Sequence, residues 1–381
     1  MPSYQPKVAL VHDDWVQTGG AESLFTTIAE IFPNAPIYTS LADWDKLPSE
    51  IDHKRIKTSF IQKIPLAKYF FKALLPIYPL AFESFDFSNY DLVISSTTRF
   101  AKGIITKPKT IHVSYVNSIP RFLWEDAKQQ DYLNPIIRLL VQPALIWLKK
   151  WDRVASARVD RFIANSQNVK KKIKKVYGQN SAVVYPFADA SFFTLAKVHN
   201  WELKSENYYL VVTRLVKWKK IDIAIAATLD LDINLKIVGI GPDEKRLESL
   251  SITNHKRKTK NGVEFLGKIS KEKLRELYRN CRALIICQDE DFGISAVEAQ
   301  ACGTPVIAYG EGGVKEIVID GKSGVIFNKQ SKESLKDAII KASKLKWNVA
   351  KIRQNALRFS KSNFVKSINT QVENYVKSAR S

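Results

Sequence analysis

The chain has 381 residues, 45% of them hydrophobic, which is enough for two domains of ordinary size with separate cores. Its net charge of +21 is compatible with a nucleic-acid binder, a protein on an anionic membrane, or a member of a lysine-rich proteome. Since no run of about 18 apolar residues and no N-terminal apolar signal region occurs, the sequence predicts no membrane-spanning helix and a cytoplasmic protein.

The first half of the chain alternates short apolar runs with helical segments. A strand is predicted over 7–12 and a helix over 21–32. Further strands are predicted at 90–95, 110–116, 161–164 and 182–185. This alternation is typical of a parallel, doubly wound sheet, so we assign residues 1–188 to an N-terminal Rossmann-like domain.

Two glycines, Gly19 and Gly20, lie where the first strand meets the first helix. A tight glycine turn at this point exposes backbone N–H groups that can bind a diphosphate, although adjacent glycines also occur in plain turns. His12 and His112 lie in or beside strands, where a histidine is more often structural than catalytic. We therefore predict no histidine base.

The second half repeats the α/β pattern. Strands are predicted at 208–213, 235–239, 263–266, 283–287 and 305–308. They indicate a second parallel sheet, which we assign to a domain over 206–360; the last stretch, from about 361 to 378, is an amphipathic helix. The three cysteines lack metal-ligand spacing and are predicted to be buried thiols: Cys281, Cys287 and Cys302.

Two carboxylates surround a glycine after the strand at 283–287. Glu290 is predicted in the loop at the carboxyl end of that strand, and Glu298 about one turn into the next helix, where open α/β sheets bind ligands. Gly293 allows close approach of a ligand, and the helix start attracts a phosphate. Buried carboxylates can accept hydrogen bonds from ribose or hexose hydroxyls, whereas one isolated glutamate is more often an ordinary loop or helix residue.

Two cations follow the strand at 208–213. Arg214 and Lys219 match the charge that builds on a leaving nucleoside diphosphate, and a solvated basic loop is the alternative interpretation. Gly239 and Leu266 lie at the ends of two other strands, where the alternative is a plain turn. The sequence Asp230-Leu-Asp232 has the spacing of a metal motif but precedes a strand, so we interpret it as a turn.

The segment 289–318, with EDFGISAVEAQA and then EGGVKE, resembles the donor-site signature of retaining GT-B glycosyltransferases, family 4, group 1. It is most similar to the branch of O-antigen and exopolysaccharide mannosyltransferases. The resemblance implies two Rossmann-like domains facing across a cleft, with the C-terminal helix, 361–381, packed back on the first. It also implies metal-independent transfer of a hexose with retention of configuration, with no tightly bound cofactor, from GDP-mannose or a UDP-sugar to a glycan or polyprenyl-linked acceptor.

Individual roles follow from this resemblance. Glu290 would hold the hexose, Glu298 the ribose, and Arg214 with Lys219 the diphosphate. The remaining donor-site positions are Gly19, Gly20, Gly239, Leu266, Phe292, Gly293 and Ile294. On the acceptor side, Asn117 stands where similar enzymes have a histidine; it can donate a hydrogen bond but cannot titrate.

Basic residues concentrate between 149 and 175, close in sequence to apolar segments at 60–78 and 136–148. This combination indicates contact with an anionic inner-membrane surface. The alternative interpretation, which the sequence supports equally, is that these residues form solvated helix faces over ordinary core helices. Three other functions stay open: a sugar-nucleotide epimerase on the same scaffold, a nucleic-acid-binding protein, which the interfacial pattern disfavours, and a weakly active or non-catalytic donor-binding subunit.

Overall fold

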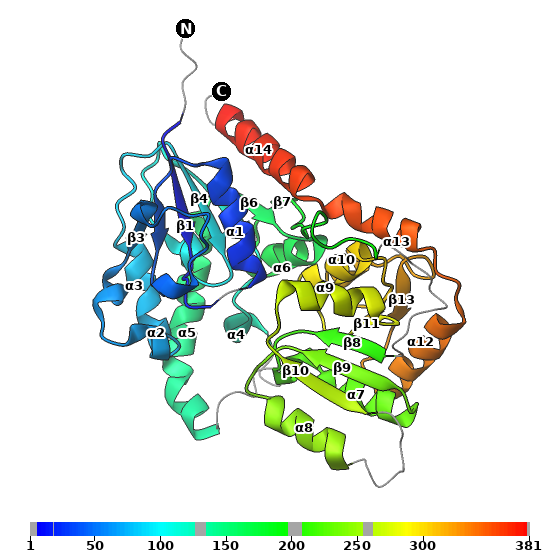
Figure 1. Cartoon of the computed structure of the whole chain (residues 1–381). Coiled ribbons are helices and arrows are strands. Elements are labelled where there is room, and N and C mark those ends of the chain that lie inside the picture. The colour runs from blue at the N-terminus through cyan, green and yellow to red at the C-terminus, as the bar shows by residue number, and fades with distance from the viewer. Residues whose placement is uncertain (1–5, 18, 126–134, 197–207, 254–261, 379–381) are drawn as a thin grey trace. The chain divides into compact units, whose positions relative to one another are not determined.

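A computed structural model describes residues 6–17, 19–125, 135–196, 208–253 and 262–378 (Figure 1). Contacts divide the chain into two compact units, one made of Met1–Tyr185 with Phe364–Ser381 and the other of Pro186–Asn363. The second unit therefore begins earlier along the chain than the predicted boundary at 206.

The first unit is built on a parallel sheet of seven strands, in the order β3-β2-β1-β4-β5-β6-β7. The strands are β1 Val8–His12, β2 Ile37–Thr39, β3 Ile56–Thr58, β4 Leu92–Thr97, β5 Ile111–Val116, β6 Arg161–Ala164 and β7 Ser181–Val183. The strand order reverses between β1 and β4, which pair in parallel over five residues. In open sheets of this kind, the carboxyl ends of the strands at the reversal are where ligands bind.

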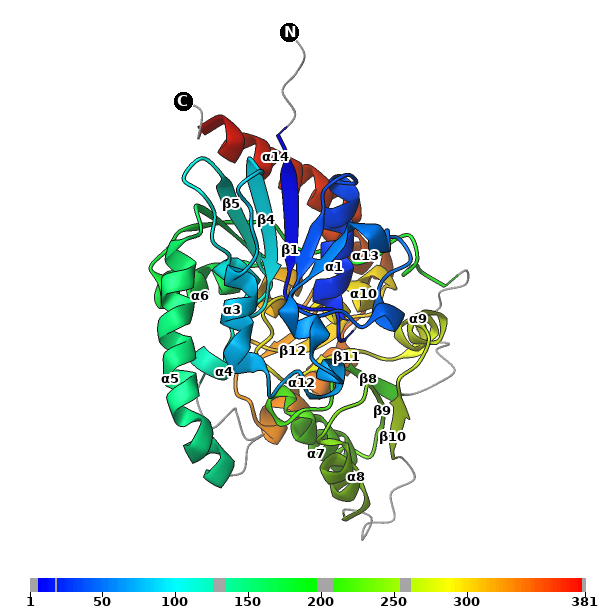
Figure 2. The ribbon, with the colours of Figure 1, turned by 90° about the vertical axis from the view of Figure 1, so that its left-hand side faces the viewer.

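Helices cover both faces of this sheet (Figure 2). They are α1 Gly20–Ile31, α2 Ala67–Phe70, α3 Tyr78–Glu83, α4 Arg121–Trp124, α5 Pro135–Ala157, α6 Gln167–Tyr177 and α14 Lys361–Ser378. Phe82 of α3 and Trp151 of α5 share a core cluster with Val11 of β1, whereas Phe25 of α1 stacks on the next residue, His12. Alternate residues of β1 thus face opposite helix layers, as the period of a strand requires.

The C-terminal helix α14 belongs to the first unit from Phe364 onward, in agreement with the expectation that it packs back there. The ring of Phe364 lies edge-on to that of Tyr115, with ring centroids 5.9 Å apart. Farther along the helix, the guanidinium of Arg161 lies 5.8 Å from the ring of Tyr375. The chain therefore returns to the sheet in which it began.

The second unit has a parallel sheet of six strands, in the order β10-β9-β8-β11-β12-β13. The strands are β8 Tyr208–Val212, β9 Asn234–Val238, β10 Val263–Gly267, β11 Leu284–Ile286, β12 Val306–Tyr309 and β13 Gly324–Phe327. The helices are α7 Ile221–Asp230, α8 Glu244–Thr253, α9 Lys271–Asn280, α10 Ile294–Ala301, α11 Val314–Ile317, α12 Lys332–Lys344 and α13 Val349–Ala356. Here the strand order reverses between β8 and β11, and Figure 1 shows α9, α10 and α13 on the opposite side of the sheet from α7 and α8.

The predicted parallel sheets are confirmed, but three strands were missed: β2, β3 and β13. Each has only three or four residues, too few for an apolar alternation to stand out. All three cysteines are buried free thiols, as predicted, and Asp232 lies in a turn with φ 52°. In the described part of the chain, no helix combines the length and apolarity needed to cross a bilayer.

Candidate functional site

The loops that follow β8 and β11 meet at the reversal of the second sheet. Lys219 ends the short 3-10 helix Lys217–Lys219 beyond β8, and Glu290 lies four residues beyond β11. The Lys219 Nζ atom forms an ion pair with Glu290 Oε1, which also accepts a hydrogen bond from Gln288 Nε2. The structure thus pairs Lys219, which was predicted to bind a phosphate, with Glu290, which was predicted to bind a sugar.

Lys219 is held in this position by its surroundings. Only 9% of the residue is exposed, and its ammonium lies 4.2 Å from the ring centroid of Trp218. A buried lysine needs a partner because desolvation of an isolated charge is costly, and Glu290 supplies it. A ligand hydroxyl that reaches Glu290 therefore meets a carboxylate whose orientation is already fixed.

Arg214 differs from Lys219 in its exposure. It lies two residues after β8 and is exposed, and no ion pair or hydrogen bond to its guanidinium is found within the described ranges. An unengaged guanidinium can bind a phosphate through two parallel hydrogen bonds. The structure therefore places an available cation on the same loop as Lys219.

Glycines allow the loops of this site to pack backbone against backbone. Gly239 has φ 135°, and a Cβ atom there would lie 1.8 Å from the carbonyl oxygen of Thr213. Gly313 N donates to Glu290 O at 2.7 Å, and a Cβ on Gly312 would lie 2.2 Å from that same oxygen. Gly239 thus has a packing reason at a predicted donor-site position, and the glycine pair after β12 supports the Glu290 loop.

The helix α10 begins at Ile294, directly after Gly293. Gly293 has φ 107° and no side chain caps the helix, so its first N–H groups are left for another acceptor. Phe292 is buried with its ring against Phe359, which leaves only its backbone for a ligand, and Leu266 is half-buried in β10.

Glu298 lies on α10, half-buried, and its Oε2 atom accepts a hydrogen bond from Tyr278 Oη at 2.9 Å. Burial raises the pKa of Glu298 to about 7, although the Tyr278 hydrogen bond acts in the opposite direction. One carboxylate oxygen is thus oriented by Tyr278, an arrangement suited to a neutral hydroxyl ligand on the other oxygen.

In the first unit, Asn117 follows β5 beside the end of β4. Its Nδ2 atom donates to Ser96 Oγ at 3.0 Å, and its carbonyl oxygen accepts from Asn165 Nδ2 at 2.7 Å. Gly19 is the N-cap of α1 and, like Gly20, is exposed; no side chain caps the helix. The glycine turn and Asn117 thus occupy the carboxyl edge of one sheet.

Both histidines are structural in their geometry. His12 is buried and stacks on Phe25 at 4.6 Å, and burial lowers its pKa to about 4. His112 is buried with its Nε2 atom 2.9 Å from Ser95 Oγ, and burial lowers its pKa to about 3. Neutral, enclosed imidazoles agree with the prediction that neither is a catalytic base.

Two aspartates after β1 were not predicted as site residues. Asp13 accepts four backbone N–H bonds, from Thr98, Arg99, Phe100 and Ala101, at 2.6 to 2.9 Å. Asp14 forms an ion pair with the Arg99 guanidinium. The only signal in the sequence is an acidic pair directly after a buried strand, which by itself does not reveal a loop 85 residues away.

Residues 196–359 match the sequence model of a family described as Glycosyl transferases group 1. An uncharacterized glycosyltransferase from Methanocaldococcus jannaschii is 29% identical over 210 residues, which are 55% of this chain and 57% of the relative. A D-inositol 3-phosphate glycosyltransferase from Gordonia bronchialis is 29% identical over 218 residues, 52% of this chain and 47% of that protein. The matched stretch thus spans about half the length of these curated relatives.

Solved structures match nearly the whole chain at lower identity. Sucrose-phosphate synthase from Thermosynechococcus elongatus superposes with a TM-score of 0.72 at 18% identity, covering 98% of this chain and 100% of the other. HepE from Anabaena, solved with UDP and glucose, gives 0.64 at 18% identity, with 97% and 100% covered. At this identity the likeness shows the fold, which is the GT-B fold of two parallel-sheet α/β domains.

Proposed function

From the group 1 glycosyltransferase domain that spans residues 196–359, we propose that this chain transfers a hexose from a nucleotide-sugar to a glycan or polyprenyl-linked acceptor. GDP-mannose is the favoured donor and a UDP-sugar the alternative. The observation that carries the proposal is the Lys219–Glu290 ion pair on loops that also present Arg214 and the uncapped start of α10. This set offers cations to a diphosphate and a fixed carboxylate to sugar hydroxyls.

The proposed reaction retains the configuration of the sugar and uses no metal. The bond between C1 of the hexose and the diphosphate oxygen breaks while the acceptor oxygen bonds to C1 on the same face. The acceptor proton passes to the leaving phosphate. Arg214 and Lys219 stabilise the charge on that phosphate, Glu290 orients the hexose, and Glu298 binds the ribose.

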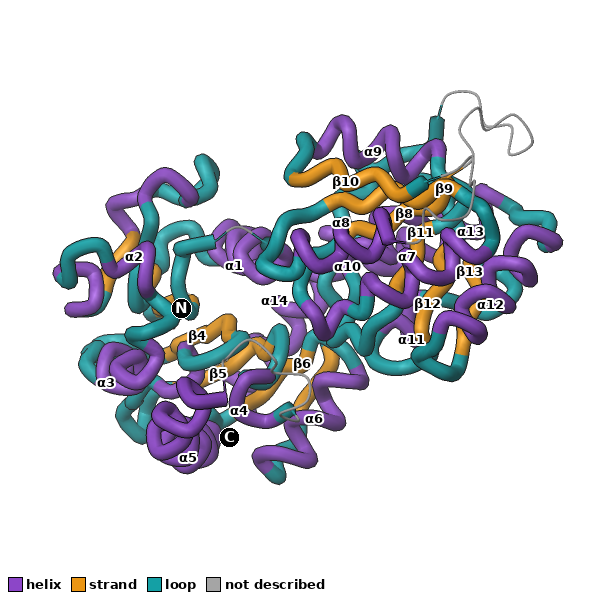
Figure 3. Tube along the Cα trace, turned by 90° about the horizontal axis from the view of Figure 1, so that it is seen from below, coloured by secondary structure: helices purple, strands orange, loops and turns teal. Residues whose placement is uncertain are grey.

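We further propose that the first unit works at an anionic membrane surface. Exposed apolar side chains on α2, α3 and α5, and on the residue before α2, support this: Leu66, Tyr69, Phe70, Leu80, Leu140, Ile146 and Trp147. Figures 1 and 3 both show α3 beside α5. Exposed basic residues follow on α5 and α6, among them Lys149, Lys150, Arg153, Lys170 and Lys174. The side chains of 136–139, part of the apolar segment predicted at 136–148, lie outside the described residues.

A thermal-shift panel tests the donor assignment, because a ligand that binds the folded state raises the melting temperature by mass action. The panel contains GDP, UDP, ADP and their hexose conjugates. We expect GDP and GDP-mannose to raise the melting temperature of the wild type and to have little effect on Glu298→Ala. The exposed Glu333→Ala on α12 is the control and should respond like the wild type.

Two outcomes would contradict the proposal. If no nucleotide shifts the wild type, residues 196–359 do not bind a nucleotide-sugar under these conditions and the donor site is wrong. If a sugar nucleotide binds but is converted into its epimer without any acceptor, the chain is an epimerase rather than a transferase.

A further inference from the structure

A charged cluster at the reversal of the first sheet supplies none of the side chains assigned to the donor site, although it lies beside the glycine turn of Gly19 and Gly20. It consists of Asp14 at the end of β1, Arg99 beyond β4, and Glu22 in the first turn of α1. Asp14 is 1% exposed and the Arg99 side chain 16% exposed. Ionisable groups at this edge of an open sheet are placed where a ligand would bind.

Hydrogen bonds to Asp13 hold the loop that carries Arg99. The Asp13 carboxylate accepts hydrogen bonds from four backbone N–H groups of this loop. Burial would raise the pKa of Asp13, but Arg99, His12 and the backbone hydrogen bonds outweigh it and the pKa is lowered. The charge of Asp13 is therefore used to hold the loop.

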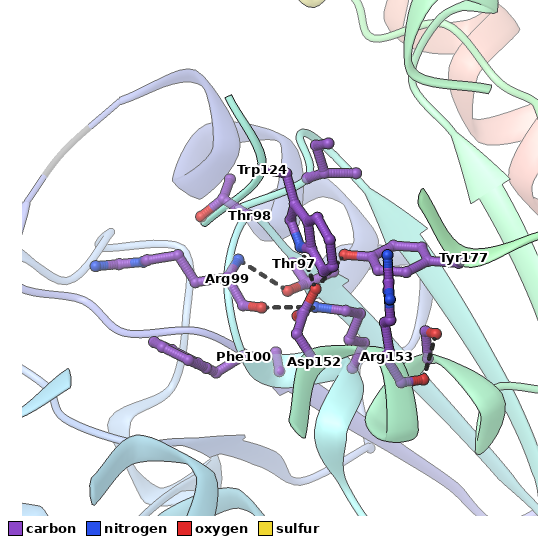
Figure 4. Close-up of polar contacts among 12 residues, drawn as sticks. Thr97, Thr98, Arg99, Phe100, Trp124, Asp152, Arg153 and Tyr177 are labelled. Carbon is purple, nitrogen blue, oxygen red and sulfur yellow. Dashed lines mark hydrogen bonds and ion pairs between the residues drawn. The ribbon is translucent and has the colours of Figure 1, made fainter. Parts of the chain in front are cut away.

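A second buried group holds the same loop from the other side. The Lys102 Nζ atom donates to the carbonyl oxygen of Arg99 at 2.7 Å and pairs with Asp152. Asp152 also accepts from Trp124 Nε1 at 2.7 Å and from Tyr177 Oη at 2.8 Å. Figure 4 shows the Arg99 carbonyl facing this group while its guanidinium extends away from it. The backbone of Arg99 is thus fixed so that its side chain pairs with Asp14.

Glu22 completes the cluster from α1. It is half-buried, and a Cβ atom on Gly19 would lie 3.0 Å from its Oε2 atom, so the carboxylate lies over the glycine turn. Burial raises the pKa of Glu22 to about 7; Asp14 and Asp13 add to this, while its own backbone N–H and Arg99 act against it. Near neutral pH the group can therefore both accept and donate a hydrogen bond.

We infer that Glu22, supported by the Arg99–Asp14 pair, binds a hydroxyl group of a neutral, polyhydroxylated acceptor such as a sugar. Together with Asp13, the two acids of this cluster outnumber its one cation, so a phosphate would be repelled while hydroxyl groups find both donors and acceptors. The glycan end of the acceptor, rather than any phosphate that links it to a lipid, occupies this site. The inference rests on the proposed function for the identity of the acceptor.

Saturation-transfer NMR with methyl α-D-mannoside and methyl α-D-glucoside on the full chain tests binding without turnover. We expect transfer to a hexoside in the wild type and in Glu30→Gln, an exposed glutamate on the same helix, and its loss in Glu22→Ala. The melting temperature of each variant checks its folding, and the isosteric Glu22→Gln serves if Glu22→Ala unfolds. No signal in the wild type, or equal signals in wild type and Glu22 variants, would overturn the inference.

Kinetics with radiolabelled GDP-mannose and a membrane lipid extract supply the second readout. We expect Glu22→Ala to raise the apparent KM for the extract by about 10- to 100-fold, the effect of one lost hydrogen bond to a charged group, with the donor KM unchanged. The pH dependence of this KM through about pH 7 should disappear in Glu22→Gln. If hexosides bind but no donor is turned over, the proposed function fails and the hydroxyl site stands.

Discussion

Lys219 and Glu290 form an ion pair although the chain separates them by 71 positions. The pair joins the loop after β8 to the loop after β11, the two strands at which the second sheet reverses. A cation proposed to bind a phosphate and a carboxylate proposed to bind a sugar thus orient each other in the absence of a ligand. This pre-organisation would lower the cost of fixing both groups during the proposed transfer.

Removal of Lys219 should reduce transfer more than removal of its neighbour. We expect Lys219→Ala to lower kcat by about 100- to 1000-fold, the usual effect of deleting one preorganised group that stabilises transition-state charge. The control is Lys217→Ala, an exposed lysine on the same short helix, which should stay near wild-type activity. Equal activity of the two variants would exclude a diphosphate role for Lys219. Circular dichroism confirms that both are folded.

Glu298 should make stability depend on pH. Its pKa rises from 4.5 in the unfolded chain to about 7 in the fold, so between these values the folded state binds more protons than the unfolded state. Stability is therefore lost as the pH rises from 4.5 to about 7 and then levels off. In Glu298→Gln this contribution is absent. The unfolding free energy of the variant minus that of the wild type should therefore increase as the pH rises from 4.5 to about 7. Urea titrations at a series of pH values measure it; a constant difference across the window would be contrary to the assignment.

The buried Lys102–Asp152 pair should be far more sensitive to truncation than an exposed one. Lys102→Met leaves a buried carboxylate without its cation, which costs about 3–5 kcal/mol of unfolding free energy. Lys341→Met removes a partner from the exposed pair with Asp320, each side chain about half exposed, and should cost less than about 1 kcal/mol. Chemical denaturation compares the two. Similar values would mean that Lys102 is not buried as described.

Gly239 should tolerate no side chain. In Gly239→Ala the new Cβ would approach the Thr213 carbonyl oxygen to 1.8 Å at a φ of 135°, so the loops after β8 and β9 cannot pack and nucleotide binding is lost. Gly178→Ala is the matched control, because Gly178 also has a positive φ but nothing within 4 Å of a Cβ. It should cost about 1 kcal/mol and leave binding intact. Thermal melts with and without GDP distinguish the two glycines.

The basic residues of α5 should control binding to anionic vesicles. The double variant Lys149→Glu and Lys150→Glu should bind phosphatidylglycerol vesicles at least about 30-fold more weakly, since each basic residue near the surface contributes about 1 kcal/mol. Two exposed lysines of the second unit, changed in Lys344→Glu and Lys346→Glu, provide a control with the same change in net charge. Cosedimentation measures both. If the two double variants lose binding equally, net charge rather than α5 is responsible.

The sequence by itself determined the two parallel sheets, the amphipathic C-terminal helix, and the positions of Glu290, Gly293 and Glu298 around the start of one helix. These features depend on local periodicity, glycine chemistry and short spacings, which neighbouring residues specify directly. The strands β2 and β3 were not predicted because an apolar alternation cannot be recognised in three residues. Pairing with their neighbours in the sheet defines them as strands.

Only the tertiary structure decided which distant groups meet. The chain order does not reveal that Lys219 pairs with Glu290, that Asp13 holds the loop of Arg99, or that Asp152 faces Lys102. Parallel sheets bring loops together at the carboxyl edge according to strand order, and strand order follows from the packing of the whole core rather than from any segment. Burial then fixes the pairing, because a charge removed from water is stable only beside a partner of opposite sign or beside several hydrogen-bond donors, as at Asp13.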